Sequence, residues 1–398
     1  MFNFQNYLNN KINDIKSYFV KEVEDWDENF FQNRTPEEKE RYKVSKKRNR
    51  TVNTEIGFTT FNRRIYWDTI EKRTRYFTDE EFNIEKRARV MKDLKLKILS
   101  NLIKNLITKK TYTHIQAEYE YSYFSKNFIS RIFKNAKIEK LIPEQKFKVL
   151  DNQKLNICAD DAFVTCWNEN GLKQQYCCRI LTFNLGKKEI YLYRNKLEKK
   201  ITSFMLFKTN NAPKQEELHN FTMQTINNHY DIKLNIFAIN WEYNNYNLVI
   251  AGDGALWIRA MASWLGCYYI LDKYHAYSYL WKSFVNVRGK HQKKAFDWTK
   301  YLDVTTTFSN GSYKELITIL ENNHNKVTKK NFNYFKNNEQ GIINQNASWN
   351  IGCSAESDVY HFLKSLTNGA KIYHYQTLNN MLIAKANYLN SRSYLNSA

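Results

Sequence analysis

Four acidic residues stand where a carboxylate could act on a substrate. Asp160 and Asp161 lie in the middle of an apolar, strand-like run, ICADDAF, and Asp253 lies between two glycines in VIAGDGALWI. Glu356 opens an apolar-periodic helix in CSAESDVYHFL. Burying a carboxylate without a partner costs several kcal/mol or keeps the group protonated, so we expect a cation to compensate these charges.

Three of these acids can form one metal site. Carboxylates on a first strand, at the end of a following strand and on a late helix can converge on two divalent cations about 3.5–4 Å apart. Mg²⁺ suits such oxygen ligands, and Mn²⁺ is the other candidate. We expect Asp160, Asp253 and Glu356 to hold the metals. The competing interpretation is structural: Asp253 is then a turn residue, and Glu356 an acid that favours the helix N-terminus.

The elements that must position these acids follow Pro143. Alternating apolar residues predict strands at 154–165 and 174–185, joined by a turn at 169–171, and a third strand in KKEIYLYR, 187–194. Helix and strand patterns then alternate: helix 214–230, strand 247–251, a helix from 256, strand 267–271 and a helix from 275. This order predicts an α/β fold in which helices flank a mixed sheet. From 290 onward the chain reads as mostly helical, with a loop at 344–353.

The region before Pro143 has a different texture. Residues 1–33 predict a helix, and 44–77 predict a small β-element rich in Thr and Arg. A helix over 94–107 precedes two shorter ones, Thr111–Tyr121 and Ser125–Ala136, each opened by a hydroxyl residue suited to an N-cap. This outline is that of a helix-turn-helix with a basic last helix, which such motifs place in the major groove. An ordinary three-helix packing unit has the same pattern.

The charge of the chain favours a polyanionic partner. Its net charge is +21, and residues 34–140 hold 27 basic and 14 acidic residues, a surplus of 13. Double-stranded DNA is the leading candidate; a membrane surface is weaker, because the basic stretch is not one amphipathic helix. A solvated charged hairpin without a ligand remains the alternative. The candidate DNA contacts are Lys46, Lys47, Arg48, Arg50, Arg63, Arg64, Lys126, Arg131, Lys134 and Lys137.

Length and composition limit the class of protein. A chain of 398 residues predicts two or three domains. We divide the chain into six segments, given at the end of this paragraph. The six cysteines contain no C-x-x-C pair, and the N-terminus does not read as a signal peptide, so we expect a cytoplasmic protein with reduced thiols. The apolar window 255–271 contains Arg259 and Gly266 and reads as a buried helix and strand, with no membrane span. The segments are 1–43 (helical), 44–90 (basic β-element), 91–142 (helix-turn-helix-like), 150–290 (first part of the catalytic core), 291–343 (helical insertion) and 344–398 (helical, with the third acid).

Several of these motifs together resemble a known family. ICADDAFV, IAGDGALWI, LDKYHAY and GCSAESDVYHFL, with TEIGFTTFNRRIYWD and the two helices TYTHIQ and FSKNFISRIFKNA, resemble the DDE-type transposases of bacterial insertion sequences and integrative conjugative elements. The resemblance spans roughly residues 45–390. It implies an RNase H-like catalytic domain: a mixed sheet flanked by helices, preceded by the basic β-element and the helix-turn-helix-like region and followed by a mostly helical C-terminal part.

The resemblance also implies roles for residues. Asp160, Asp253 and Glu356 take the places of the metal-binding acids, and Asp161 is the rival for the first place. Asp272 and His275 match a D-x-x-H signature that supports the site in several such families. Two positions depart from the family pattern: Lys364 stands for an arginine after the glutamate, and Tyr373 for a tryptophan.

Three functions are compatible with this reading. The first is a transposase that cuts and rejoins double-stranded DNA, both element ends and target, and that could act as a homo-oligomer on DNA. The second is an inactive or domesticated copy that only binds DNA through residues 44–140. The third is a nuclease for RNA–DNA hybrids, against which the N-terminal DNA-binding-like region argues.

Overall fold

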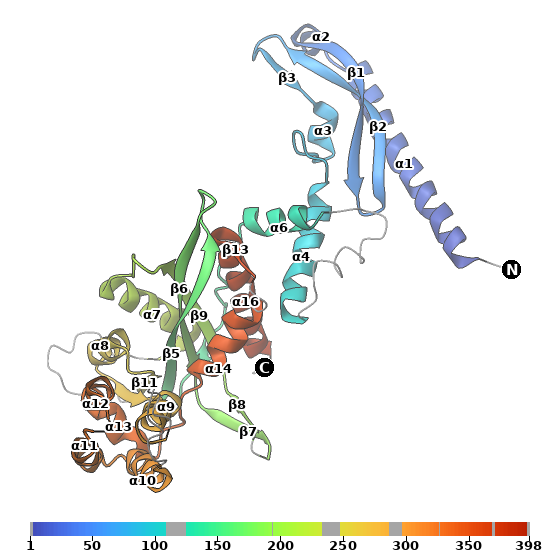
Figure 1. Ribbon diagram of the computed structural model, residues 1–398. Coiled ribbons are helices and arrows are strands. Elements are labelled where there is room, and N and C mark those ends of the chain that lie inside the picture. Colours follow the sequence, from blue (N-terminus) through green and yellow to red (C-terminus); the bar gives the residue numbers. More distant parts are fainter. Residues whose placement is uncertain are drawn as a thin grey trace, which may run out of the picture. The chain divides into compact units, whose positions relative to one another are not determined.

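The chain divides into two compact units. The computed structural model describes residues 3–108, 125–192, 194–232, 247–285, 297–325, 327–367 and 371–395. The N-terminal unit comprises 1–136 and the C-terminal unit 137–398, so the predicted core, insertion and C-terminal segments belong to one unit. Both units appear in Figure 1. In the part of the chain that is described, no helix has the length and apolar character that crossing a membrane requires.

The N-terminal unit packs helices around an antiparallel sheet of order β1-β2-β3. The predicted small β-element is therefore confirmed. Ser125 caps α6 as predicted, because its hydroxyl accepts the Phe128 N–H at 3.1 Å. The predicted helix Thr111–Tyr121 lies outside the described residues. The elements are α1 (Phe4–Gln32), α2 (Pro36–Arg41), β1 (Tyr42–Thr54), β2 (Gly57–Asp68), β3 (Arg73–Arg75), α3 (Phe77–Glu81), α4 (Lys92–Thr108) and α6 (Lys126–Asn135).

Buried ion pairs join β2 to the helices on either side of it in the sequence. The Asp27 carboxylate of α1 accepts the backbone N–H of Arg64 at 3.0 Å, the guanidinium of Arg64 at 2.7 Å and the Thr78 hydroxyl at 2.7 Å. Arg63 pairs with Asp79 of α3 at 2.6 Å. All four charged side chains are buried. These contacts fix the sheet between α1 and α3.

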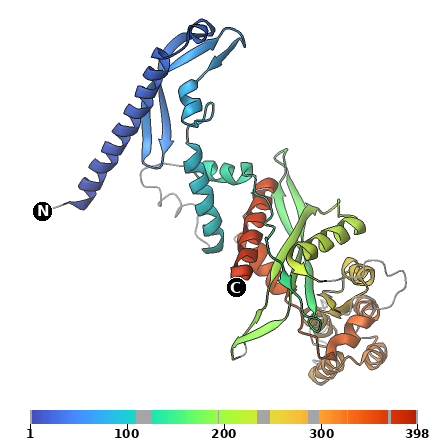
Figure 2. The same ribbon diagram turned by 180° about the vertical axis from the view of Figure 1, so that it is seen from behind.

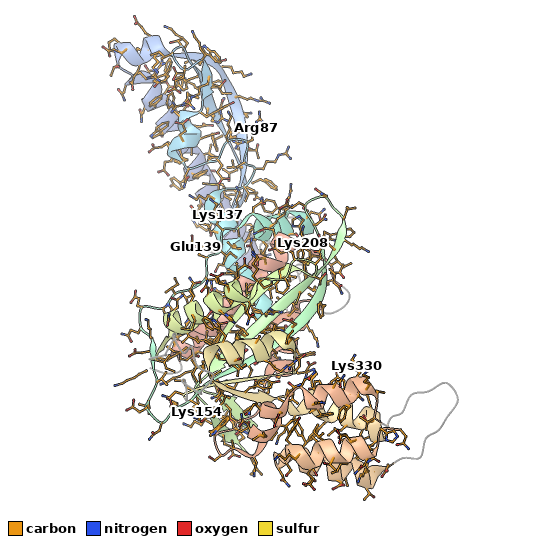
Figure 3. All side chains as sticks on the ribbon, turned by 90° about the vertical axis from the view of Figure 1, so that its left-hand side faces the viewer. Arg87, Lys137, Glu139, Lys154, Lys208 and Lys330 are labelled. Carbon is orange, nitrogen blue, oxygen red and sulfur yellow. The ribbon has the colours of Figure 1, made fainter. Side chains whose placement is uncertain are left out.

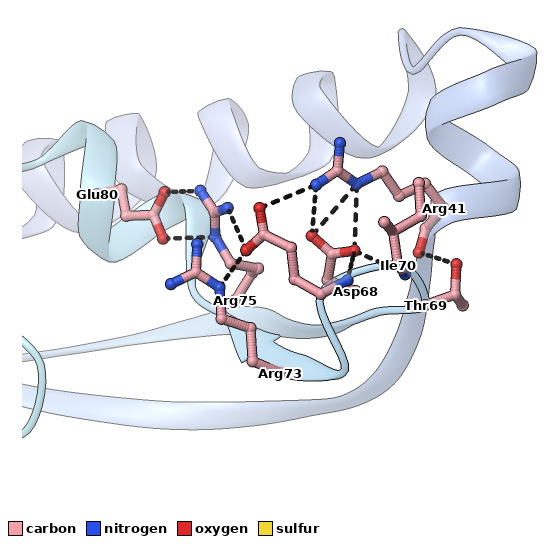
Figure 4. A network of polar contacts seen from close by, with 8 residues as sticks. Arg41, Asp68, Thr69, Ile70, Arg73, Arg75 and Glu80 are labelled. Atoms are coloured by element: carbon pink, nitrogen blue, oxygen red, sulfur yellow. Dashed lines mark hydrogen bonds and ion pairs between the residues drawn. The ribbon is translucent and has the colours of Figure 1, made fainter.

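A second network closes the far end of the same sheet (Figure 4). Arg41, at the end of α2, donates to both carboxylate oxygens of Asp68, at the end of β2. Asp68 also accepts the backbone N–H groups of the following turn, at Ile70 and Glu71. The hydrogen bonds from Arg41 lower the pKa of Asp68 to about 2, so the pair stays charged in mildly acidic solution.

The C-terminal unit is built on a six-stranded mixed sheet. Its main path runs β12-β11-β5-β6-β9, and the short β13 pairs with the end of β5. The elements are β4 (Phe147–Lys148), β5 (Leu155–Trp167), β6 (Lys173–Asn184), β7 (Lys187–Tyr191), β8 (Arg194–Leu197), β9 (Ile201–Lys208), α7 (Gln215–His229), β10 (Tyr230–Asp231), β11 (Leu248–Gly252), α8 (Leu256–Leu265), β12 (Tyr268–Leu271), α9 (Lys273–Phe284), α10 (Trp298–Ser309), α11 (Tyr313–Asn322), α12 (Lys329–Lys336), α13 (Glu339–Ile343), the 3₁₀ turn η1 (Asn344–Asn346), α14 (Ala355–Val359), the π turn η2 (Tyr360–Lys364), α15 (Ser365–Thr367), β13 (Tyr373–His374) and α16 (Tyr375–Leu395).

The predicted mixed sheet flanked by helices is confirmed, with one correction. β5, β6 and β9 are antiparallel neighbours, and β11 and β12 add to β5 in parallel. The third strand is β9, whereas the predicted third strand, KKEIYLYR, contributes to a separate hairpin of β7 and β8. The reason is burial: every residue of β7 is exposed, while Ile201 and Phe204 of β9 are buried.

The two faces of the sheet carry different partners. Ile157 and Ala159 of β5 face the main core, to which α7 and α8 contribute. Cys158, between them, faces a smaller core that includes Ala355 of α14. Side chains alternate along a strand, so position along β5 decides which helices a side chain meets. The two views in Figures 1 and 2 show helices on both sides of this sheet.

Side-chain amides occupy both edges of the sheet. At the β12 edge, Asn344 donates to the Tyr269 carbonyl at 2.9 Å, and Gln345 donates to the Leu271 carbonyl at 2.8 Å. At the β9 edge, the Asn390 amide of α16 accepts the Thr202 N–H at 2.8 Å and donates to its carbonyl at 3.1 Å. Edge groups that would otherwise be unpaired are thus satisfied within the chain.

We predict that Asp27→Ala lowers the free energy of unfolding of the N-terminal unit by about 3 kcal/mol, because the buried Arg64 guanidinium and the Thr78 hydroxyl lose their buried acceptor and Arg64 keeps only the partly exposed Glu28 carboxylate. Urea unfolding of the full chain, followed by circular dichroism, measures this change. The matched control is Asp14→Ala on the same helix, which removes an exposed pair with Lys11 and should cost less than about 0.5 kcal/mol. Equal effects of the two substitutions would contradict a structural role for Asp27.

Candidate functional site

Strand register brings the first two predicted acids side by side. β11 runs parallel to β5, and its last residue, Gly252, lies opposite Ala159. The next residues along the two strands, Asp160 and Asp253, therefore lie at neighbouring positions. Their charges interact, since the Asp253 carboxylate raises the pKa of Asp160.

The next strand adds a third carboxylate to this row. Leu271 of β12 lies opposite Gly252, so Asp272 follows at the same level as Asp253. The Asp272 N–H donates to the Gly252 carbonyl at 2.8 Å, which continues the ladder by one residue. Asp272 is also the N-cap of α9 and is buried. We name Asp160, Asp253 and Asp272 the acid row.

Glu356 approaches the row from a distant part of the chain. Asp160 follows Cys158 by two residues and so lies on the same face of β5, where the Ser354 N–H donates to the Cys158 sulfur at 3.5 Å. Ala355 packs against this face, and Glu356 is the next residue. Its carboxylate is close enough to raise the pKa of Asp160 further. Asp253 and Glu356 are therefore each near Asp160, and a single site formed by all three acids stays a prediction.

Asp161 lies on the opposite face and has another partner. Arg179, directly opposite it on β6, donates from two guanidinium nitrogens to the two carboxylate oxygens, both at 2.8 Å. The guanidinium lies over the Trp257 ring, 3.8 Å from its centroid. Asp160, and not Asp161, is therefore the member of the acid row. The cation expected to compensate a buried carboxylate is therefore present for Asp161, and it is the Arg179 guanidinium.

The surroundings of Asp160 favour its protonated form. The side chain is buried, and burial, followed by the Asp253 and Glu356 carboxylates, raises its pKa to about 6. The backbone N–H of Asp161 and the charge of His275 oppose this rise. The carboxylates of Asp253 and Glu356 repel the ionised form of Asp160, and a bound cation would reduce this repulsion.

His275 lies in contact with the row. Its Nδ1 lies 2.7 Å from Asp272 Oδ2. This hydrogen bond raises the pKa of His275, and the carboxylates of Asp272, Asp160 and Asp253 add to the effect. The predicted D-x-x-H pair is therefore in contact, one turn apart at the start of α9.

Two glycines let the Asp253 loop pass between its neighbours. A Cβ on Gly252 would come within 2.7 Å of the Ala159 carbonyl oxygen and 2.5 Å of Ile258 Cδ1. Gly254 has φ +91°, a conformation that side chains disfavour, and a Cβ there would meet Asn338 and Tyr334 at 3.0 Å. The helical insertion, through α12 and the residue before α13, therefore bounds the loop that carries Asp253.

The helix that carries Glu356 is interrupted by a π turn. Val359, Phe362, Leu363 and Leu366 are buried, as predicted. Lys364 donates to Glu356 at 3.2 Å, eight residues away, across the widened turn of η2. The buried Lys385 of α16 donates to the His361 carbonyl at 2.5 Å and the Ser365 hydroxyl at 2.7 Å, which holds the turn in place.

The donor set suits a hard divalent cation, although its side chains stand apart. Within the described ranges, no three His, Cys, Asp or Glu side chains are gathered closely enough to hold a metal ion as they stand. The candidate ligands Asp160, Asp253 and Glu356 offer carboxylate oxygens, the ligands that Mg²⁺ prefers. Closing on an ion would require these carboxylates to draw together and Glu356 to leave Lys364.

The predicted DNA-contact residues fall into two groups. Lys46, Lys47 and Arg48 are exposed on β1, and Arg131, Lys134 and Lys137 are exposed in and after α6. Arg63 and Arg64 are buried in the ion pairs described above, and Arg50 is largely buried beside Asp79, so the interpretation of these three as phosphate contacts is wrong. The side chain of Lys126 lies outside the described residues.

Sequence reasoning missed two residues of the site. Arg179 could have been found by counting the hairpin register outward from the turn at 169–171, which pairs it with Asp161. Tyr334, whose buried hydroxyl has no hydrogen-bond partner among the described residues, borders the Asp253 loop. No local sequence signal marks it, because it lies 80 positions away on the insertion.

The raised pKa of Asp160 predicts a pH-dependent stability. The folded protein binds this proton more tightly than the unfolded chain does, so the free energy of unfolding should fall as pH rises from about 4 to about 6. Asp160→Asn should abolish this contribution, which changes the stability difference between variant and wild type by about 3 kcal/mol across that window. Urea unfolding with chelator present at both ends of the window measures it. The control, Asp303→Asn, removes an exposed carboxylate of α10 and should change the free energy of unfolding by less than about 0.5 kcal/mol. A difference for Asp160→Asn that stays constant across the window would refute the shift.

Similar proteins occur in Caldanaerobacter subterraneus subsp. tengcongensis. The UPF0236 protein TTE0402 is 24% identical over 329 residues, which cover 81% of this chain and 60% of the relative. The UPF0236 protein TTE2489 is 23% identical over 329 residues, with 81% and 64% covered. The chain thus spans less than two thirds of the length of these curated relatives.

A family model described as "Uncharacterised protein family (UPF0236)" matches residues 5–393. The match includes both units, the acid row and the segment that carries Glu356. The protein therefore belongs to the UPF0236 family.

Proposed function

We propose that the protein is a DDE-type transposase of a mobile genetic element, which cuts and rejoins double-stranded DNA with Mg²⁺ or Mn²⁺. The observation that carries the proposal is that Asp253 and Glu356, from distant parts of the chain, both lie close enough to Asp160 to raise its pKa. The order β9-β6-β5-β11-β12, antiparallel in its first three strands and parallel in its last two, supports an RNase H-like catalytic domain.

The residues of the site have separate roles in this proposal. Asp160, Asp253 and Glu356 would hold the cations, which when bound supply Lewis-acid stabilisation of the charge on the phosphodiester oxygens. His275, oriented by Asp272, offers a proton beside the acids. In the proposed reaction water attacks one phosphodiester and releases a 3′-hydroxyl and a 5′-phosphate. This 3′-hydroxyl then attacks a phosphodiester of the target strand, whose own 3′-oxygen leaves as a hydroxyl.

The name of one relative supports a mobile element. Another UPF0236 protein of Caldanaerobacter subterraneus subsp. tengcongensis, also 23% identical to this chain, bears eleven gene labels, from TTE0033 to TTE2212. A protein encoded many times in one genome is what a copying element produces.

The free cysteines of the described chain support a reducing, cytoplasmic compartment. A homo-oligomer on the DNA ends is part of the proposal.

The first test is DNA cleavage. With a supercoiled plasmid that carries the DNA flanking the gene, we expect nicking that needs Mg²⁺ or Mn²⁺ and that Asp253→Asn slows by about 100-fold or more, since a ligand charge is lost. Gel electrophoresis of the plasmid forms measures the rate. Asp303→Asn is the matched control and should nick at the wild-type rate. Equal nicking by Asp253→Asn would overturn the assignment, and no nicking by wild type would favour a protein that only binds DNA.

The second test is DNA binding by the exposed residues of β1. Replacing Lys46, Lys47 and Arg48 by Gln should weaken duplex binding and reduce the slope of log affinity against log salt by about 2 to 3, if each contacts one phosphate. Fluorescence anisotropy between about 50 and 200 mM salt measures the slope. The charge-matched control replaces Lys314, Lys329 and Lys330, exposed on α11 and α12, by Gln; Lys330 is labelled in Figure 3. An unchanged slope in the β1 variant would exclude this contact surface.

A further inference from the structure

The hairpin of β7 and β8 belongs to no core. The two strands pair only with each other, with Lys187 opposite Leu197, and lie outside the main sheet. At the base, backbone hydrogen bonds between Leu185, Gly186 and Glu198 join the hairpin to the ends of β6 and β9. In Figures 1 and 2 the hairpin extends away from the body of the C-terminal unit. We name the described residues 187–192 and 194–197 the arm.

The arm combines positive charge with an apolar tip. Lys187, Lys188 and Lys196 are exposed along its length. At the tip, Ile190, Tyr191 and Leu192 are 47%, 69% and 79% exposed. A two-stranded ribbon exposed on both faces buries too little surface to be stable by itself, so large apolar side chains kept in water there point to a ligand that covers them.

The base of the arm is tied to the segment that carries Glu356. Lys200, just after the arm, forms an ion pair with Asp358 of α14, and Asp358 also accepts the Ser354 hydroxyl at 2.7 Å. The Lys187 ammonium lies 4.0 Å from the position of a Cβ on Gly352, in the loop before α14. The base of the arm is therefore linked to the helix that carries the third acid and to the loop before it.

We propose that the arm is a second DNA-binding element, which lies in a groove of the duplex with its lysines on phosphates and its tip side chains against the bases. The inference rests on the proposed function of the acid site. A two-stranded ribbon fits the major groove, and apolar wedges that separate base steps are a known way to bend a duplex. Duplex DNA is favoured over an anionic membrane because Lys200, at the base of the arm, pairs with Asp358 on the helix that carries Glu356.

The test of the lysines compares two variants of equal charge in the full chain. The arm variant replaces Lys187, Lys188 and Lys196 by Gln, and the control is the Lys314, Lys329 and Lys330 variant defined above. We measure binding to a duplex of about 30 base pairs in chelator, so that cleavage plays no part. The arm variant should lose about 2 to 3 in salt slope, and the control less than about 1. Equal losses would overturn the proposal.

The test of the tip uses base stacking as its readout. A duplex that carries 2-aminopurine should brighten on binding wild type, because the inserted side chains unstack the base, and Ile190→Ser with Leu192→Ser should abolish this rise while keeping the salt slope. The same rise in the variant would overturn the role of the tip. Arm-dependent sedimentation with vesicles of phosphatidylcholine and phosphatidylglycerol, without arm-dependent duplex binding, would overturn DNA in favour of a membrane.

These outcomes separate the arm from the acid site. Arm-dependent binding without nicking by wild type would support the arm and count against the transposase activity. Nicking that is abolished by Asp253→Asn but insensitive to the arm variant, together with an unchanged salt slope, would keep the activity and overturn the arm. Thermal unfolding of the arm, tip and control lysine variants should match wild type, since the side chains substituted in them are exposed.

Discussion

The parallel register of β5, β11 and β12 is the constraint on which the candidate site depends. It brings the residues after Ala159, Gly252 and Leu271 to one level of the sheet, and all three are aspartates. Backbone hydrogen bonds impose this proximity whether or not the charges favour it. The apolar faces of the sheet supply the free energy that keeps like charges together, and the site stores repulsion that a bound cation would remove.

The proximity of Asp160 and Asp253 was predictable, because it follows from the order and register of neighbouring strands. The partner of Asp161 was within reach of the same reasoning, since hairpin register needs only the position of a turn. The third strand was not, because KKEIYLYR and the segment of β9 both have residues suited to strands. Only packing decides between them: Ile201 and Phe204 find a core, whereas the arm does not.

Positive charge was the least informative part of the sequence. Arg63 and Arg64 read like the exposed lysines nearby, yet their partners are acids on α1 and α3, and Asp27 is 37 residues from Arg64. Such distant pairing has no local signature. The basic surplus of residues 34–140 thus includes guanidinium groups that hold the N-terminal unit together, and the outward charge is carried by other side chains, among them those of β1.

The amides at the two edges of the sheet limit how copies of the chain can associate. Asn344 and Gln345 occupy carbonyls of β12, and Asn390 imitates a neighbouring strand at Thr202 of β9. Where these side chains sit, an incoming strand finds its backbone partners already taken, so edge-to-edge growth of the sheet is blocked at both ends. Addition of a strand at these positions would first have to displace three side chains, which disfavours association by extension of this sheet.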